Sequence, residues 1–144
     1  MLNMDLRIRR RGTAIVENQD GGILIVAGRS KVFLLPGGTA NHHESRHKAA
    51  IRELKEETGL KTYYSKVLFR HNCDRIHKAH GGYYFKDAHT VVLIKAKGHI
   101  RPRDDAKYAD WYYPDSKIKL STATAKIIKR YYDYKNKKWW QFWK

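Results

Sequence analysis

Four of the five glutamates of this chain lie in one segment, residues 38–60, which reads GTANHHESRHKAAIRELKEETGL. They are Glu44, Glu53, Glu56 and Glu57. The chain of 144 residues is otherwise strongly basic, with a net charge of +16. Carboxylates held this close together repel one another unless a cation neutralises them. The segment therefore predicts a site for a divalent cation, for which carboxylate oxygens are the usual ligands.

The spacing within the segment is that of a helix, which we predict over residues 43–58. Glu53, Glu56 and Glu57 stand at positions i, i+3 and i+4, so all three project from one side of that helix. Gly59 is the expected C-terminal cap. The apolar residues that would face the core are Ala50, Ile51 and Leu54. The helix is thus predicted to present its carboxylates on a rigid support.

The segment also fits a longer pattern. The pattern begins with Gly, any five residues, Glu and any seven residues. It continues with Arg-Glu, an apolar residue, any residue, Glu-Glu, any residue, Gly and a final apolar residue. The fixed positions are Gly38, Glu44, Arg52, Glu53, Glu56, Glu57 and Gly59, and the apolar positions hold Leu54 and Leu60. The pattern resembles the signature of the Nudix hydrolases, which cleave nucleoside diphosphates linked to another moiety. The resemblance implies an α+β fold of the α/β/α sandwich type, with a mixed β-sheet between helices.

The resemblance also implies roles for individual residues. The implied metal ligands are the Gly38 carbonyl, Glu53, Glu56 and Glu57, and the implied metal is Mg²⁺, with Mn²⁺ as the alternative. The implied catalytic set is Glu53, Glu56 and Arg52, with Glu53 as either a ligand or a base. Arg52 and Glu44 would pair with each other and so orient the loop and the helix.

Resemblance outside the segment is looser. Arg29 stands where relatives often carry an arginine that contacts phosphate, and a solvated turn residue is the alternative. Relatives often supply one more carboxylate from a late loop, and Asp104 and Asp105 are the candidates in this chain. These three residues are our predicted substrate-binding group. Phe33 replaces a tryptophan of many relatives, and Trp111 is expected to pack in the core rather than to stack on a base.

Apolar, aromatic and β-branched runs predict the remaining elements. The predicted strands cover residues 7–16, 23–28, 32–35, 61–70, 83–85, 90–97 and 110–113. A turn is expected at 18–22, where Asx residues precede paired glycines, and another at 36–38. Polar loops are expected at 71–82 and 98–109. A second helix is expected over 122–134, with Ser121 as its N-cap.

The length suits one domain, which we expect to cover residues 1–144 and to end in a helix and a basic aromatic tail at 121–144. Cys73 is the single cysteine, so no disulfide can form within the chain, and a reducing, cytoplasmic setting is expected. The first residues lack the apolar region of a signal peptide. No apolar run approaches the ~20 residues of a membrane span.

Two further segments leave alternatives open. The loop at 71–82 contains His71, Cys73, Asp74, His77 and His80. Their spacing fits no common zinc pattern, so we expect the loop to shape substrate choice, and a transition-metal site is the alternative. The tail at 135–144 reads KNKKWWQFWK. Its aromatic residues are expected to pack on the domain or on a second subunit, as in a homodimer. Membrane binding and stacking on nucleobases are the alternatives.

The sequence therefore predicts a Mg²⁺-dependent hydrolase that cleaves a phosphoanhydride bond of a nucleoside triphosphate or a related nucleoside diphosphate derivative. The charge of +16 attracts polyanions, and so it favours an RNA 5′-end pyrophosphohydrolase as the alternative enzyme. A module that only binds nucleotide or RNA is the alternative from another class. Such a module could dispense with its metal-site carboxylates, whereas this chain keeps all of them.

Overall fold

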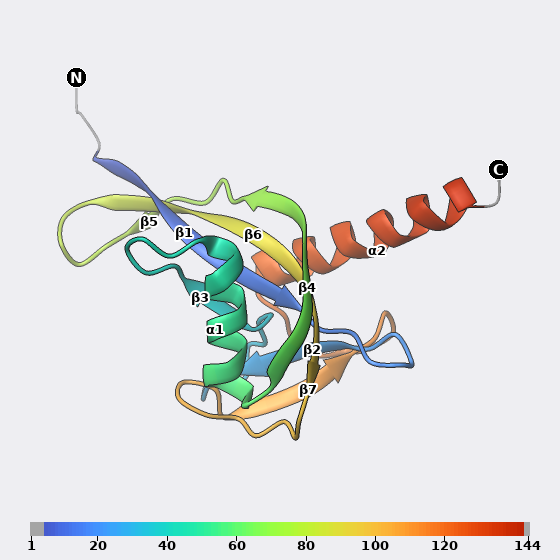
Figure 1. Cartoon of the computed structure of the whole chain (residues 1–144). Helices are drawn as coiled ribbons and strands as arrows, with labels where there is room; N and C mark the ends of the chain where they lie inside the picture. Colours follow the sequence, from blue (N-terminus) through green and yellow to red (C-terminus); the bar gives the residue numbers. More distant parts are fainter. Residues whose placement is uncertain (1–4, 143–144) are drawn as a thin grey trace.

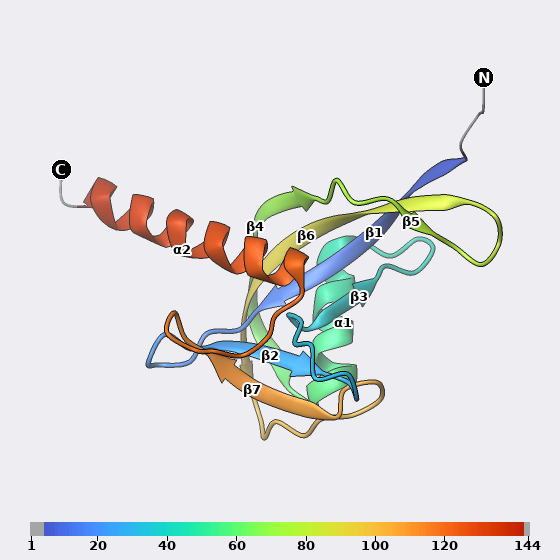
Figure 2. The same cartoon turned by 180° about the vertical axis from the view of Figure 1, so that it is seen from behind.

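The computed structural model describes the backbone of residues 5–142 and the side chains of residues 5–137. The elements, in chain order, are β1 (Leu6–Ile15), β2 (Ile23–Ala27), β3 (Gly37–Thr39), α1 (Arg46–Thr58), β4 (Lys61–Asn72), β5 (His77–Lys78), β6 (Tyr84–Lys97), β7 (Tyr108–Tyr112) and α2 (Thr122–Phe142). Figure 1 shows α1 in front of the main sheet, and Figure 2 shows α2 on the opposite side. The fold is the expected α/β/α sandwich.

The main sheet is mixed. Its strands lie in the order β3-β1-β6-β4, and β5 extends it by pairing with β6. β1 and β6 run parallel, and the other pairs are antiparallel. β2 and β7 form a separate antiparallel pair. Because β1 and β6 are distant in sequence and parallel, their pairing brings residues near position 10 beside residues near position 88.

The two faces of β1 meet different helices, because successive side chains in a strand point to opposite faces. Ala14 and Val16 pack with the α1 residues Ala50 and Leu54. Ile15, which points the other way, belongs to a second cluster with residues of α2. The α2 residues of that cluster are Ile127, Ile128 and Tyr131. Two separate apolar layers therefore hold the helices to the sheet.

Gly12 sets how closely α1 approaches β1. A Cβ atom at Gly12 would lie 2.1 Å from the carbonyl oxygen of Arg46 and 2.4 Å from the amide nitrogen of Ala50. No side chain larger than hydrogen fits there unless the helix moves. Ala49 and Ala50, the small residues on the facing side of the helix, are fully buried. The helix that carries the glutamates thus rests directly on the strand backbone.

The face of β1 that α2 meets is apolar at its inner end and charged at its outer end. Ile15 is covered by α2, whereas Arg7, Arg9 and Arg11 lie on the same face farther out. Their partners on β6 are Phe85, Asp87 and His89 respectively. Figure 2 shows α2 crossing the inner end of β1 and continuing away from its outer end. The outer part of this face is therefore not covered by α2.

The motif helix begins later than predicted, at Arg46 rather than at position 43. His43 has φ of 67°, which a helix cannot accommodate. Ser45 is the N-cap, and its side chain accepts a hydrogen bond from the amide of Lys48. The helix ends as predicted, because Gly59 adopts the left-handed conformation, with φ of 79°, and its amide donates to the Lys55 carbonyl.

Several strand predictions were wrong in extent. Residues 32–35 form only isolated bridges, at Phe33 and Leu34, and not a strand. The predicted turn at 36–38 overlaps β3, and the predicted loop at 71–82 includes the end of β4 and all of β5. The predicted strands 83–85 and 90–97 are a single strand, β6. β7 begins two residues earlier than predicted, and α2 runs eight residues past the predicted end at 134.

Two predictions on aromatic residues have different outcomes. Trp111 is partly buried and packs against the apolar layer beneath α1, which confirms its expected core role. The side chains at 138–144 lie outside the described residues, and so does the predicted packing of the tail tryptophans. Within the described part of the chain, no helix is both long and apolar enough to cross a membrane.

We predict that Gly12→Ala destabilises the fold by about 1–3 kcal/mol, because the added methyl group forces α1 away from β1. Urea unfolding of the variant and the parent chain measures the difference. Gly81→Ala is the control, because its Cβ would meet only the ring of Tyr83, at 3.1 Å. Equal unfolding midpoints for Gly12→Ala and the parent would show that the close approach is not required.

Candidate active site

Arg52 holds the carboxylates of the motif in place. Its guanidinium donates two hydrogen bonds to Glu44, at 2.8 and 2.9 Å, and a third to the Thr39 carbonyl at 3.1 Å. It also donates to Glu53 at 3.0 Å and to Glu56 at 3.1 Å. The hydrogen bonds from Arg52, together with one from the Asn41 amide, lower the pKa of Glu44 to about 2. Arg52 and Glu44 therefore pair as the resemblance implied, and they tie the loop before α1 to the helix.

The carboxylates of Glu53 and Glu57 lie against the two glycines of β3, Gly37 and Gly38. A Cβ atom at Gly38 would lie 2.5 Å from the carboxyl carbon of Glu53. The Gly37 amide donates to Glu57 at 3.3 Å. Gly37 itself packs on β1, since a Cβ there would lie 2.3 Å from the Gly12 carbonyl oxygen. The glycine pair thus allows two carboxylates to lie against the backbone of β3.

Glu57 is a partly buried carboxylate of the motif. Burial, and then the neighbouring charge of Glu53, raise the pKa of Glu57 to about 8. The hydrogen bond from the Gly37 amide lowers the pKa of Glu57, but by less than burial and Glu53 raise it. A carboxylate in this position lacks a sufficient positive partner among the protein groups around it. Its surroundings therefore favour a bound cation.

The residues present fit a divalent cation in their chemistry. Three carboxylates and a backbone carbonyl offer oxygen ligands of the kind that magnesium and manganese take. As arranged, no three His, Cys, Asp or Glu side chains of the described residues converge on one point. Glu56 is turned toward Arg52, with which it forms an ion pair, and its side chain is 44% exposed. Glu53, Glu56, Glu57 and the Gly38 carbonyl are the groups that would hold the ion.

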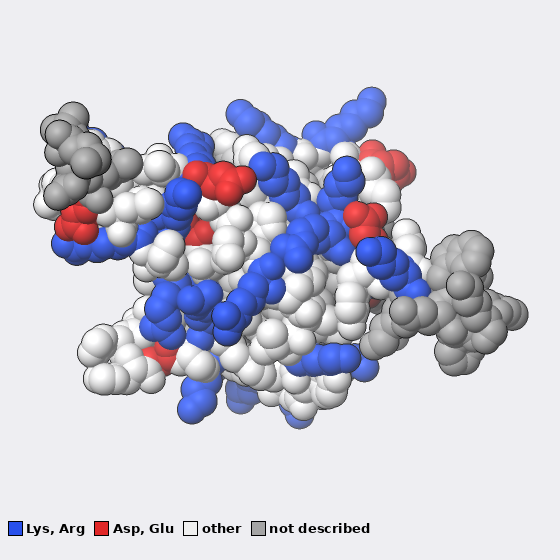
Figure 3. All heavy atoms as spheres, turned by 90° about the horizontal axis from the view of Figure 1, so that it is seen from above, with Lys and Arg blue, Asp and Glu red and all other residues white. Residues whose placement is uncertain are grey.

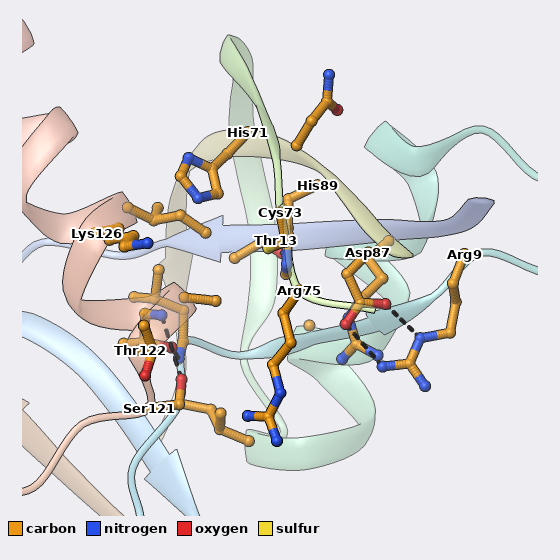
Figure 4. A pocket seen from close by; sticks show the side chains of 18 of the residues that line it. Arg9, Thr13, His71, Cys73, Arg75, Asp87, His89, Ser121, Thr122 and Lys126 are labelled. Carbon is orange, nitrogen blue, oxygen red and sulfur yellow. Dashed lines mark hydrogen bonds and ion pairs between the residues drawn. The ribbon is translucent and has the colours of Figure 1, made fainter. Parts of the chain in front are cut away.

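A cavity of about 430 Å³ opens beside Glu57 and Gly37. Residues of β1, β6, the β4–β5 loop and the start of α2 line it (Figure 4). Figure 4 shows Arg9 and Asp87 at one end, Lys126, Ser121 and Thr122 at the other, and Arg75 between them. The volume falls within the ~300–1,000 Å³ that is usual for small-molecule sites. Of the α1 carboxylates, Glu57 therefore lines a space of ligand size.

Arginines on β1 give one wall of the cavity a positive charge. Arg9 forms an ion pair with Asp87, with a second contact of 2.9 Å. Arg11, two residues along, lines the cavity near Glu57, and no hydrogen bond from its guanidinium is found among the described residues. Burial, and then the neighbouring Arg9, lower the pKa of Arg11. An arginine with unused donors in a cavity wall is suited to bind an anionic group such as a phosphate.

His89 contributes an uncharged polar group to the same wall. It is 8% exposed, and its Nδ1 lies 2.7 Å from the Thr13 hydroxyl oxygen. Burial, and then the charge of Arg11, lower the pKa of His89 to about 4. The imidazole is therefore neutral at physiological pH. Its Nε2 atom is buried without a hydrogen-bond partner among the described residues.

The predicted substrate-binding residues lie elsewhere. Arg29, Asp104 and Asp105 are exposed, and none of them lines the cavity. They lie close together, because the Lys107 amide donates to the Ala27 carbonyl and joins the two loops. This rim is also tied to the end of α1, since the amide of Arg103 donates to the Glu57 carbonyl. Their role in binding substrate stays a prediction.

Sequence reasoning missed most of the cavity wall. The missed residues are Arg9, Arg11, Thr13, Asp87, His89, Ser121, Thr122 and Lys126. A signal was present, because polar residues recur at every second position in 7–13 and stand at both 87 and 89, which places them on one face of each strand. From the predicted loop at 71–82, His71, Cys73, Asp74 and His77 do line the cavity.

Comparison with known proteins agrees with this site. The model of the NUDIX domain matches residues 7–140. The chain belongs to the Nudix family. Among curated proteins, the ADP-ribose pyrophosphatase of Methanocaldococcus jannaschii is 31% identical over 123 residues, which are 82% of this chain and 70% of the relative. Membership makes this Nudix protein a hydrolase of pyrophosphate bonds, as the motif predicted.

Solved structures show the same fold. A Nudix hydrolase family member from Chromobacterium violaceum is 34% identical, with a TM-score of 0.75, over 90% of this chain and 80% of its own. The MutT Nudix hydrolase from Burkholderia pseudomallei is 23% identical, with a TM-score of 0.67, over 83% of this chain and 94% of its own. The second likeness concerns the fold alone.

The low pKa of His89 predicts how this Nudix domain responds to acid. His89 binds its proton near pH 6.5 in the unfolded chain and near pH 4 in the folded one. Its contribution to stability is therefore complete above about pH 6.5 and is lost as the pH falls through about 4. Between these values we expect the unfolding free energy of the parent to fall more than that of His89→Asn, by on the order of 3 kcal/mol.

Urea unfolding at several pH values measures this difference. His80→Asn, which changes an exposed histidine of the β5–β6 hairpin, should keep the pH dependence of the parent. If His89→Asn kept it as well, another group would be responsible for the loss of stability in acid.

Proposed function

We propose that this protein is a Mg²⁺-dependent pyrophosphohydrolase of nucleoside diphosphate derivatives, with ADP-ribose as the first candidate substrate. The observation that carries the proposal is the meeting of Glu53 and Glu57 with the Gly37–Gly38 backbone at the edge of the cavity. The name of the Methanocaldococcus jannaschii relative supports ADP-ribose. The cavity is large enough to take a nucleoside or a sugar phosphate.

The reaction consists of the addition of water across a phosphoanhydride. A water oxygen forms a bond to one phosphorus, the bond from that phosphorus to the bridging oxygen breaks, and the bridging oxygen leaves with the other phosphate. From ADP-ribose the products are AMP and ribose 5-phosphate. Magnesium, when bound, neutralises the phosphate charge and lowers the pKa of a coordinated water.

The side chains of this protein have separate tasks in that reaction. Glu56 and Glu57 hold the ion, and Glu53 serves as a further ligand or accepts the proton of the attacking water. Arg52 keeps Glu53 and Glu56 oriented through the hydrogen bonds described above. Arg11 binds a phosphate oxygen from the cavity side, where its guanidinium faces the same region as Glu57.

We predict that Glu56→Gln and Glu57→Gln each lower the metal-dependent turnover of ADP-ribose by about 100-fold or more, because each removes a charged ligand from the ion. Release of AMP, with and without Mg²⁺, measures turnover, and titration calorimetry with Mn²⁺ measures binding of the ion directly. Glu17→Gln is the matched control, since Glu17 is the one glutamate outside the motif and bonds to Tyr131 and Lys135 of α2.

The substrate class is tested with a panel of ADP-ribose, nucleoside triphosphates, dinucleoside polyphosphates and 5′-triphosphorylated RNA. Preferred turnover of ADP-ribose, lost in the two motif variants and kept in Glu17→Gln, supports the proposal. Turnover confined to triphosphates or to RNA would overturn the substrate assignment but keep the chemistry. Nucleotide binding without hydrolysis of any substrate would indicate a binding module.

A further inference from the structure

A second hollow, of about 370 Å³, lies next to the active-site cavity. It is lined by Arg7, Ile8, Arg9, Arg10, Thr39, Ala40, His42, Tyr83 and Phe85. We name it the outer groove. Arg9 lines both the cavity and the outer groove. Along β3, Gly37 lines the cavity and Thr39 lines the outer groove, so Gly38 stands at the boundary between them.

This placement has a consequence for any substrate whose phosphoanhydride is cleaved at Gly38. One half of such a molecule would occupy the cavity. The other half would leave toward Thr39 and enter the outer groove. The groove is therefore positioned for the group on the far side of the scissile bond, and its lining indicates what that group is.

The lining combines arginines with aromatic rings. The guanidinium carbon of Arg7 lies 4.0 Å from the centre of the Tyr83 ring, and that of Arg9 lies 4.3 Å from the centre of the Phe85 ring. His77, which lines the cavity and not the groove, stacks on Phe85, with ring centres 5.0 Å apart and planes 15° from parallel. Flat guanidinium and aromatic groups of this kind form platforms on which nucleobases stack.

The charge around the groove favours a phosphate on the same ligand. Among the residues that line it, three are arginines and none is acidic. Asp5 and Asp87 pair with Arg7 and Arg9 but do not line the groove. Figure 3 shows the molecule from above, with Lys and Arg spread over a face that has few Asp or Glu. The overall charge of +16 has the same sign.

Part of the groove also has unused backbone groups. β3 pairs with β1 only at residues 11–13, and the Ala40 amide adds one bond to the Arg10 carbonyl. On this side, residues 6–9 of β1 have no strand partner within the described part of the chain. Their exposed amide and carbonyl groups can therefore bond to polar groups of a ligand.

We infer that the outer groove binds a second nucleotide, with its base stacked on the Arg7–Tyr83 and Arg9–Phe85 pairs and its phosphate held by the arginines. The inference rests on the proposed function, because it assigns the group on the far side of the bond that is cleaved. A dinucleoside polyphosphate and the 5′ end of a nucleic-acid strand both supply this chemistry. Within the proposed class of nucleoside diphosphate derivatives, the ribose 5-phosphate half of ADP-ribose would offer the arginines a phosphate but no base, whereas a second nucleotide would fill the groove.

The test measures binding without hydrolysis, in EDTA. The probes are AMP, diadenosine diphosphate and a 5′-phosphorylated strand of five adenylates, with dissociation constants taken from fluorescence-anisotropy competition. We expect the two larger probes to bind at least about ten-fold more tightly than AMP, because stacking of one base gives a gain of this size. The oligonucleotide probe distinguishes a dinucleoside polyphosphate from a nucleic-acid strand as the natural ligand. A site for nucleic acid should bind the five adenylates more tightly than diadenosine diphosphate and show a steeper salt dependence.

The variant Arg7→Gln/Tyr83→Leu should lose most of that gain and leave AMP binding unchanged. Arg7→Gln alone, at an exposed side chain, should lose part of it. The matched control is Lys95→Gln/Tyr64→Leu, which removes another cation–aromatic pair, 5.3 Å apart, where β6 pairs with β4. It lines neither hollow and should behave as the parent.

Three results would overturn the inference: larger probes that bind no more tightly than AMP, a gain that survives in the Arg7/Tyr83 variant, or an equal loss in the control. Because no metal is present, failure of the proposed hydrolysis would leave these affinities unaffected. The two proposals can therefore fail separately.

Discussion

The contact between α1 and the backbone of β1 at Gly12 determines where the motif carboxylates lie. The helix can approach this closely because it meets glycine on one side and alanines on the other. At that distance Glu53 and Glu57 reach Gly37 and Gly38, which themselves pack against β1. A larger residue at any of these glycines would separate the carboxylates from the cavity. Packing and chemistry are thus set by the same few backbone contacts.

The sequence allowed the motif to be predicted well because the residues involved are close along the chain. Helical spacing places three glutamates on one side, and the pairing of Arg52 with Glu44 spans only eight residues. The cavity wall could not be predicted in the same way. Arg11 and His89 become neighbours only through the parallel pairing of β1 with β6, and no local pattern specifies that register.

The errors in the predicted strands fall near the site, for physical reasons. Residues 86–89 contain Lys, Asp and His and were left between two predicted strands, yet they belong to β6, where Asp87 and His89 face the cavity. Gly37 and Gly38 suggested a turn, yet they form an edge strand, because their missing side chains make room for β1 and for Glu53. In this protein, polar residues inside strands line the cavity, and glycines inside strands leave space for a neighbouring backbone or for a carboxylate.

The parallel pairing of β1 with β6 also governs when the cavity can form. The two strands are joined by nearly seventy intervening residues, and closing so long a loop costs entropy before any contact repays it. Residues 121–127 form another wall of the cavity. They reach it only after the chain has run from the end of β7 back to the face of β1. Helix α1 and its glutamates can assemble locally and early. The binding space is therefore a late product of folding, completed only when the most distant segments have met.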